Sequence, residues 1–244
     1  MKYLIVGASS GLGREIAYSF AKRKNDLILI SRDERDLLSI ASDLKNKFNV
    51  NIEISVADFS DFEQVKKIIS NRDIMKELDG VILPIGLMFE KDDNNLNELK
   101  INKIFFANFL SITFLITELL KIFSERNFLI IGFGSVSGLL GRNINVHYAA
   151  AKRALESYFE SLAFQNKNNK LKIQFYTLGY LDTNLSFGKK LILPKGKTKK
   201  LAEIVFKNKE KSFLKIHYPI FWNIFVFILK LVPFNLLIKL KKIF

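Results

Sequence analysis

The chain contains no cysteine, only two histidines (His147 and His217) and four prolines in 244 residues. Without thiols it forms no disulfides and performs no thiol chemistry, and two histidines disfavour a histidine-based metal site. No segment rich in Pro, Gly or Ser interrupts the chain, and no internal repeat is visible. Because the first strand-like run begins at Lys2, we expect no signal peptide or transit segment. These absences favour one domain with a large core.

Acidic residues are scarce in the last quarter of the chain. Residues 189–244 hold 14 lysines, no arginine and only two acidic residues, Glu203 and Glu210. They therefore carry +12 of the formal net charge of +14, and residues 1–188 carry only +2. A biased genome composition would not concentrate charge in one region, so this asymmetry indicates a separate role for the C-terminal part.

Apolar, strand-like runs alternate with amphipathic helical stretches along most of the chain. This alternation is typical of a parallel sheet that is covered by helices on both faces. We predict an α/β fold with a single doubly wound parallel sheet of the Rossmann type over residues 1–217, followed by C-terminal amphipathic helices over 218–244. The predicted strands are 2–6, 26–31, 51–57, 79–83, 127–134, 172–178 and 212–217.

A glycine-rich turn lies between the first predicted strand and the first predicted helix. The strand Lys2–Val6 is followed by Gly7-Ala8-Ser9-Ser10-Gly11-Leu12-Gly13 and then by the helical pattern Arg14–Lys24. Such a turn lets the backbone approach a pyrophosphate, which accepts hydrogen bonds from the N–H groups at the helix N-terminus. The predicted cofactor-binding residues of the turn are Gly7, Ser9, Ser10, Gly11, Leu12 and Gly13.

Tyr148 and Lys152 are four residues apart, and Ser135 lies thirteen residues upstream. Four residues are about one helical turn, so the phenol and the ammonium group project from the same face. A tyrosine, with a pKa near ~10, is a poor acid or base at neutral pH unless a nearby cation favours its ionised form. Lys152 is placed to supply that cation, and Ser135 to donate a hydrogen bond to a substrate oxygen.

With these two motifs the chain resembles the short-chain dehydrogenase/reductase family over roughly residues 1–217. The resemblance implies NAD(P) binding at the glycine turn and assigns Asn108, Ser135, Tyr148 and Lys152 to catalysis. By the same resemblance, Tyr148 protonates the carbonyl oxygen, while Lys152 lowers the pKa of Tyr148 and holds the nicotinamide ribose. Asn108 positions a water that links Lys152 to solvent, and Ser135 orients the substrate.

The resemblance extends to two further positions. Thr183 matches a threonine that contacts the nicotinamide amide, and Asp58 matches the adenine contact after the third strand. We expect His147, which is not itself a catalyst, to form a wall of the pocket beside Tyr148.

The end of the second strand argues for the choice of cofactor. An acidic residue there binds the ribose 2′-OH of NAD, whereas an arginine accommodates the 2′-phosphate of NADP. Ser31 and Arg32 follow the strand, and the resemblance places Arg32 where NADP-preferring members carry it. The alternatives are a solvated arginine in a charged turn and, because Asp33 is adjacent, NAD binding. We favour NADPH over NADH.

Residues 102–123 are apolar on almost every side of the predicted helix. A helix that is hydrophobic all round is buried on more than one face. In the family that the chain resembles, the corresponding helix and the one that carries Tyr148 pair with a second subunit. We therefore expect a homo-oligomer, a dimer or tetramer, with deep burial inside one subunit as the alternative.

The C-terminal segment combines charge with apolar residues. The run Tyr218–Leu229 is almost entirely apolar, and Phe234–Phe244 places lysines on one helical stripe and aliphatic residues opposite. A spanning helix needs about 20 apolar residues, so this shorter run is typical of an interfacial helix on an anionic bilayer. Cover for the substrate pocket and a subunit contact are the alternatives. Nucleic acid is disfavoured because arginine is absent and the aromatic residues are embedded among aliphatic ones.

The favoured function is that of a cytoplasmic NADPH-dependent ketoreductase, peripheral on the inner face of the membrane. Its substrate would be a lipid or a lipid-linked keto-sugar, with the loop Asn184–Lys200 as a mobile lid. A soluble reductase of a small ketone or alcohol is the enzymatic alternative. A non-catalytic NADPH-binding subunit is the other alternative, although it would have no need of the catalytic set.

Overall fold

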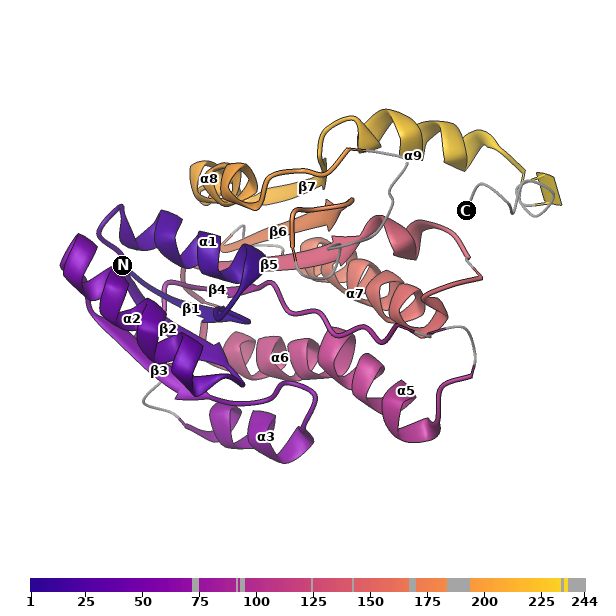
Figure 1. Ribbon diagram of the computed structural model, residues 1–244. Helices are drawn as coiled ribbons and strands as arrows, with labels where there is room; N and C mark the ends of the chain where they lie inside the picture. Colours follow the sequence, from indigo (N-terminus) through magenta and orange to yellow (C-terminus); the bar gives the residue numbers. More distant parts are fainter. Residues whose placement is uncertain are drawn as a thin grey trace.

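A computed structural model describes residues 1–71, 75–90, 92, 95–123, 125–141, 143–166, 170–183, 194–233 and 235–236. Its centre is a sheet of seven parallel strands in the order β3-β2-β1-β4-β5-β6-β7 (Figure 1). The strands are β1 (Lys2–Val6), β2 (Asp26–Ser31), β3 (Ile52–Val56), β4 (Gly80–Leu83), β5 (Phe128–Ser135), β6 (Leu171–Leu178) and β7 (Phe213–Tyr218). All seven predicted strands are confirmed, with ends that agree within one residue.

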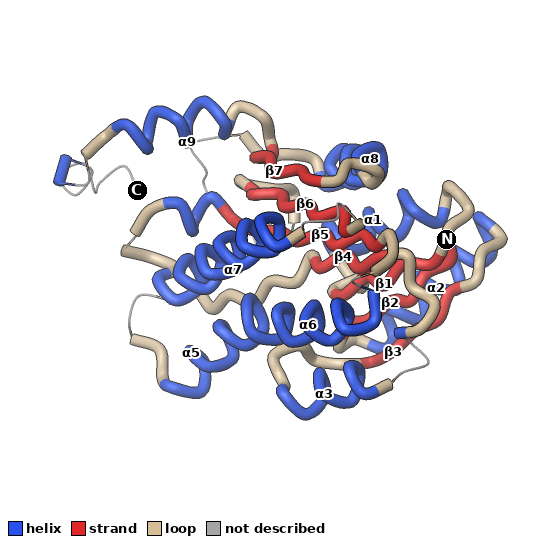
Figure 2. Tube along the Cα trace, turned by 180° about the vertical axis from the view of Figure 1, so that it is seen from behind, coloured by secondary structure: helices blue, strands red, loops and turns tan. Residues whose placement is uncertain are grey.

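Helices cover both faces of the sheet, as predicted (Figures 1 and 2). One face carries α1 (Gly11–Ala21), α2 (Glu34–Phe48) and α8 (Thr198–Asn208), and the other carries α3 (Phe62–Ser70), α6 (Ser111–Phe123) and α7 (Val146–Gln165). The side chains of Asp33 and Asp61 accept hydrogen bonds from the first turns of α2 and α3, which explains where these helices begin. The remaining helical elements are α5 (Glu98–Phe105), the π turn η1 (Phe106–Leu110), the 3₁₀ turn η2 (Val136–Leu139) and α9 (Trp222–Leu231).

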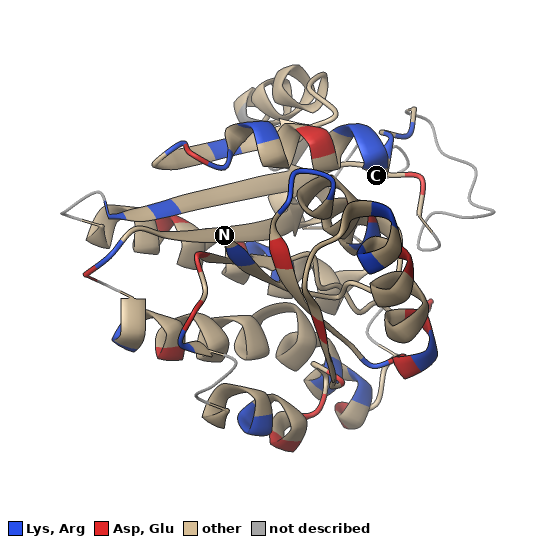
Figure 3. Ribbon diagram, turned by 90° about the vertical axis from the view of Figure 1, so that its left-hand side faces the viewer, with Lys and Arg blue, Asp and Glu red and all other residues tan. Residues whose placement is uncertain are grey.

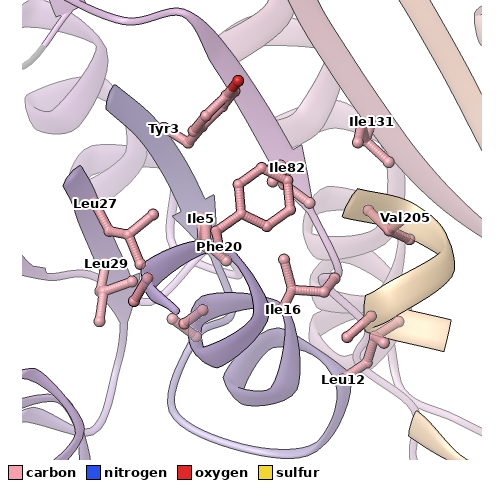
Figure 4. Close-up of a cluster of buried hydrophobic side chains, with 14 of the residues drawn as sticks. Tyr3, Ile5, Leu12, Ile16, Phe20, Leu27, Leu29, Ile82, Ile131 and Val205 are labelled. Carbon is pink, nitrogen blue, oxygen red and sulfur yellow. The ribbon is translucent and has the colours of Figure 1, made fainter. Parts of the chain in front are cut away.

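The alternation of side chains along each strand divides the core into two layers. Tyr3 and Ile5 of β1 point to the layer under α1, α2 and α8, whereas Leu4 and Val6 point to the layer under α3, α6 and α7. Figure 4 shows the first layer, in which side chains of α1 meet those of β1, β2 and α8. Strands that are buried on both faces explain the nearly continuous apolar runs of the sequence.

The predicted apolar helix 102–123 is part of a longer helical rod, Glu98–Phe123, formed by α5, η1 and α6. By length and composition this is the one helix among the described residues that could cross a membrane. Half of its most apolar window is buried within the protein, where Ile112, Leu115 and Ile116 pack against the sheet. Burial inside one subunit therefore accounts for much of its apolar character.

Helix α9 follows the carboxyl end of β7 and lies at the rim of the molecule (Figure 1). Trp222 and Val226 are buried against the protein body. The opposite side leaves large apolar side chains exposed, namely Ile220 before the helix and Ile224, Phe227, Ile228 and Leu231 within it. The end of the second predicted amphipathic stretch, 237–244, lies outside the described residues.

Of the predicted lid, residues 184–193 lie outside the described part of the chain. Thr198–Lys200 form the first turn of α8 rather than part of a loop, because Leu201 buries into the layer that covers α1. The boundary between residues 1–217 and 218–244 stays a prediction.

Candidate active site

A cavity of about 910 Å³ opens at the carboxyl ends of the strands. The strand order reverses direction between β1 and β4, which is where α/β sheets of this type bind ligands. All but one of the predicted site residues line this cavity, the exception being Asn108. The lining residues that were predicted are Gly7, Ser9, Ser10, Gly11, Leu12, Gly13, Ser31, Arg32, Asp58, Ser135, Tyr148, Lys152 and Thr183.

The glycine turn has the shape that a pyrophosphate requires. Gly7 has a φ of +91°, a conformation that residues with side chains rarely adopt. A Cβ on Gly13 would lie 2.0 Å from the carbonyl oxygen of Gly7, so only glycine allows α1 to start this close to β1. Ser10 precedes α1 without capping it through its side chain, which leaves the N-terminal N–H groups facing the cavity. The turn therefore fits a dinucleotide phosphate.

The end of β2 adds polar groups at the far side of the glycine turn. The hydroxyls of Ser9 and Ser31 are 2.7 Å apart and share a hydrogen bond, and Arg32 is exposed at the cavity wall. The Asp33 carboxylate instead accepts a hydrogen bond from Asp36 N at 3.0 Å as the N-cap of α2. The serine pair, which keeps one hydroxyl proton that is not shared between its members, and the guanidinium suit a phosphate group, because both donate hydrogen bonds.

Lys152 is buried beneath the cavity on α7. Its ammonium nitrogen donates hydrogen bonds to the carbonyl oxygens of Ile85 at 2.8 Å and Phe133 at 3.1 Å. It lies 5.9 Å from the centre of the Tyr148 ring. Burial lowers the pKa of Lys152 to about 7, because the charged form is poorly solvated there. The amine therefore exchanges protons readily near neutral pH.

Tyr148 and Ser135 both line the cavity, and the Ser135 hydroxyl donates a hydrogen bond to the Ser137 hydroxyl at 3.1 Å. Burial raises the pKa of Tyr148, and the polar side chain of Ser135 nearby opposes that rise. Burial is the largest cause of this shift, and the predicted role of Lys152 in lowering the pKa of Tyr148 stays a prediction. Ser135 is itself held by the N–H of Ser137, 3.2 Å from its hydroxyl. A neutral phenol beside a hydroxyl is arranged to donate a proton.

Asn108 is fully buried in the π turn η1 and is one step removed from the cavity. Its side-chain nitrogen donates to the carbonyl oxygens of Leu87 at 2.7 Å and Ile104 at 2.8 Å, and its oxygen accepts from Leu87 N at 3.1 Å. Asn108 therefore fixes the segment after β4 that forms one wall of the cavity. Its predicted role in holding a water stays a prediction.

Sequence reasoning missed Asp92 and misplaced His147. His147 does not line the cavity; its ring nitrogen Nδ1 lies 2.6 Å from the buried carboxylate of Asp92. That carboxylate also accepts hydrogen bonds from the backbone of His147 and Tyr148. No local signal identifies Asp92, because its partners lie more than fifty residues away along the chain.

The profile of the short chain dehydrogenase family matches residues 2–190. The chain belongs to this family. Its members interconvert CH–OH and C=O groups with NAD(P), and this chain is an oxidoreductase of that kind. The glycine turn and the Ser–Tyr–Lys set, predicted from the resemblance, lie in the matched part.

The relatives of this short-chain dehydrogenase include steroid and acyl-CoA enzymes. It is 27% identical to a Xenopus laevis protein named hydroxysteroid 11-beta-dehydrogenase 1-like protein B, over 93% of this chain and 80% of that protein. It is 30% identical to 11-beta-hydroxysteroid dehydrogenase B of Sesamum indicum over 78% of this chain, but spans only 52% of that relative. It is 26% identical to the very-long-chain 3-oxoacyl-CoA reductase of Vanderwaltozyma polyspora, over 74% and 55% of the two chains.

Solved structures share the fold at low identity. A short-chain dehydrogenase from Sphingobium yanoikuyae in complex with NADPH has a TM-score of 0.81 at 21% identity, covering 89% of this chain and 87% of its own. A 7beta-hydroxysteroid dehydrogenase has a TM-score of 0.82 at 17% identity, covering 94% and 92%. The predicted doubly wound architecture is thus confirmed.

Proposed function

We propose that this protein is an NADPH-dependent ketoreductase that acts on a lipid-like carbonyl at a membrane surface. The observation that carries the reductase assignment is that Ser135, Tyr148 and Lys152 line the same cavity as the glycine turn. NADPH is favoured because Ser9, Ser31 and Arg32 gather donors at the end of β2, while Asp33 is committed to capping α2.

The bound nicotinamide would supply the hydride, and the chain's own residues would handle the proton. Ser135 orients the carbonyl oxygen, and the Tyr148 hydroxyl donates its proton to that oxygen as negative charge develops there. Burial raises the pKa of Tyr148, so the phenol is protonated at neutral pH, the form that donates a proton. Lys152, with a pKa near 7, is suited to return a proton to the phenolate.

The lipid-like substrate is supported by helix α9. Its exposed face is apolar, and its buried Trp222 packs against Gly179 and lies 6.1 Å, centre to centre, from the ring of Tyr180. Gly179 and Tyr180 line the cavity, so the buried side of α9 adjoins the cavity wall and its apolar face lies on the opposite side of the helix. Relatives are named for steroids, whose ring system is apolar, and for a very-long-chain acyl-CoA, whose acyl chain is apolar. Peripheral attachment at the inner face of the membrane through α9 and the following lysines fits the basic C-terminal part.

A homo-oligomer is part of the proposal. The outer side of the Glu98–Phe123 rod exposes Leu99, Leu110, Phe114 and Ile122, although its inner side is buried on the sheet. An apolar strip of this kind is suited to pairing with a second subunit.

The test is NADPH consumption measured against lipid extracts and a panel of ketosteroids and long-chain keto-lipids, with and without vesicles. With a responding substrate, Tyr148→Phe is expected to lower kcat by a factor of about 10² to 10⁴, because general acid catalysis contributes that much. Tyr158→Phe is the matched control, since Tyr158 lies on the same helix but contacts Phe109 outside the cavity. Unchanged turnover in Tyr148→Phe would refute the assignment.

Two other outcomes would replace the proposal. Equal turnover of small water-soluble ketones, with no effect of vesicles, would identify a soluble reductase. Tight NADPH binding without turnover of any carbonyl would identify a non-catalytic binding subunit.

A further inference from the structure

Asp92 lies after β4, far from helix α7 in sequence, yet it binds the whole first turn of that helix. Its backbone oxygen accepts a hydrogen bond from Val146 N at 3.0 Å. One carboxylate oxygen accepts from His147 N at 3.0 Å and the other from Tyr148 N at 2.9 Å. Three consecutive N–H groups that a helix N-terminus leaves without partners are thus satisfied by one residue.

This arrangement makes Asp92 more than an ordinary cap. The side chain is fully buried, and a buried carboxylate is unfavourable unless hydrogen bonds compensate for the lost water. Here the two backbone donors, the positive end of the helix dipole and the His147 ring nitrogen at 2.6 Å provide that compensation. Asn145, the residue before the helix, makes no capping side-chain bond and has a φ of +56°. The start of α7 is therefore defined by Asp92.

The third N–H that Asp92 binds belongs to Tyr148. Tyr148 is fixed at its backbone by Asp92, and its side chain lines the cavity together with Ser135. The chain that leads to Asp92 is held in turn by Lys152 at Ile85 and by Asn108 at Leu87. Ile85, Leu87 and Asp92, which all follow β4, are thus hydrogen-bonded to three members of the catalytic set, Lys152, Asn108 and Tyr148. Asp92 orients the first turn of α7, which carries the phenol.

We propose that Asp92, supported by His147, is a positioning residue for catalysis: it fixes the start of α7 so that the Tyr148 hydroxyl keeps its place beside Ser135. The proposal rests on the proposed role of Tyr148 as the acid. Asp92 acts through the backbone of Tyr148 and does not touch the substrate. Its loss therefore lowers the rate of the chemical step without changing how the cofactor binds at the glycine turn.

The test compares Asp92→Asn with Asp61→Asn. Asparagine fills the same space, but its amide nitrogen cannot accept a hydrogen bond, so one of the two backbone donors loses its partner. Asp61 caps α3, which carries no residue of the catalytic set, and is the matched control. We expect kcat per NADPH-binding site to fall about tenfold in Asp92→Asn. This estimate takes the free energy that a helix cap usually contributes and adds it to the activation free energy of the reaction. The KM for NADPH should stay within twofold, and Asp61→Asn should retain the wild-type kcat.

Hydrogen exchange of the amides of residues 146–148 provides a readout that needs no substrate. Faster exchange there in Asp92→Asn, but not in Asp61→Asn, is the expected result, and unchanged exchange would overturn the proposal even if no carbonyl is ever reduced. A kcat within twofold of wild type, or an equal loss in both variants, would also overturn it. Should Asp92→Asn not fold, His147→Phe removes only the ring donor. It should accelerate the same exchange and lower kcat severalfold, and wild-type behaviour in both measurements would refute the proposal.

Discussion

The two parts of the chain, residues 1–188 and residues 189–244, differ in net charge and in where their apolar side chains lie. The first part is close to neutral, at +2, and its long apolar runs are buried in the two layers of the core. The second part carries +12 and includes α9, whose apolar side chains are exposed on one side. Figure 3 shows the lysines of α8 in blue; residues without charge are tan. Folding explains the first pattern but leaves the second unexplained.

This contrast indicates which part of the chain offers a surface to a binding partner. In the first part, the buried polar groups of the site have partners: Asn108 makes three hydrogen bonds and Lys152 makes two. In the second part, the acidic residues are already used, with Glu203 bound to Arg23 and Glu210 to Lys172 and Lys209. Exposed lysines such as Lys199 and Lys200 combine with an exposed apolar face to offer what an anionic lipid surface binds.

The largest expected effect is on membrane binding. In the double variant Ile224→Glu/Phe227→Glu, two side chains that are 67% and 65% exposed become acidic on the proposed contact face. Burial of each large apolar side chain contributes about 1.5–3 kcal/mol, so affinity for anionic vesicles should fall by about a hundredfold or more. Cosedimentation with vesicles measures this, while the far-ultraviolet circular dichroism should stay that of the wild type.

Leu38→Glu is the matched control for that prediction. Leu38 is 53% exposed on α2, at the other end of the sheet from α9 (Figure 1). It should leave vesicle binding unchanged. Equal binding of the double variant and the wild type would show that the apolar face of α9 serves another subunit or the substrate instead.

A smaller effect is expected at the cofactor end of the nearly neutral part. Arg32→Ala should raise the KM for NADPH about tenfold to a hundredfold, because a hydrogen bond to a charged group contributes about 1.5–3 kcal/mol. The KM for NADH, which lacks the 2′-phosphate, should change less than twofold. Arg35→Ala is the control, since Arg35 is exposed on the same turn but does not line the cavity. Equal effects on both cofactors would leave Arg32 a solvated surface residue.

The sequence predicted best what depends on local chemistry and short spacings. Periodicity alone located seven strands, and the glycine turn indicated its cavity because Gly7 and Gly13 allow contacts that a side chain would block. The spacing of Tyr148 and Lys152 placed both beside one cavity for the same reason, since one helical turn fixes their geometry.

The contacts that the sequence did not predict all depend on tertiary packing. Asp92 and Asn108 act on segments distant from them in the chain or buried between elements, and nothing near them in sequence marks that role. The effect of burial on the pKa of Tyr148 was not predicted either, because the depth at which a side chain is buried follows from the completed fold. His147 was misplaced because a helix position adjacent to the catalytic residue faces another side of α7.

The smallest expected effect is on the pH dependence of the free energy of unfolding, in which buried Lys152 is expected to differ from the exposed lysines. Burial lowers the pKa of Lys152 to about 7, whereas the unfolded chain has the usual value of ~10.4. Between these values the unfolded state binds one more proton, so the free energy of unfolding of the wild type rises with pH, by at most ~1.4 kcal/mol per pH unit. Below pH 7 both states are protonated and this contribution is constant.

Lys152→Met removes that dependence, and Lys199→Met, an exposed lysine of the basic part, should retain it. Urea unfolding at pH 6.5 and pH 9 measures the free energy of unfolding of each variant. The value for the wild type minus that for Lys152→Met should increase by at most ~2–3 kcal/mol from the lower to the higher pH. Identical pH slopes for the wild type and Lys152→Met would mean that Lys152 keeps the ordinary pKa of a lysine. The amine could then hold charge beside Tyr148, but it would be too weak an acid to return a proton to the phenolate near neutral pH.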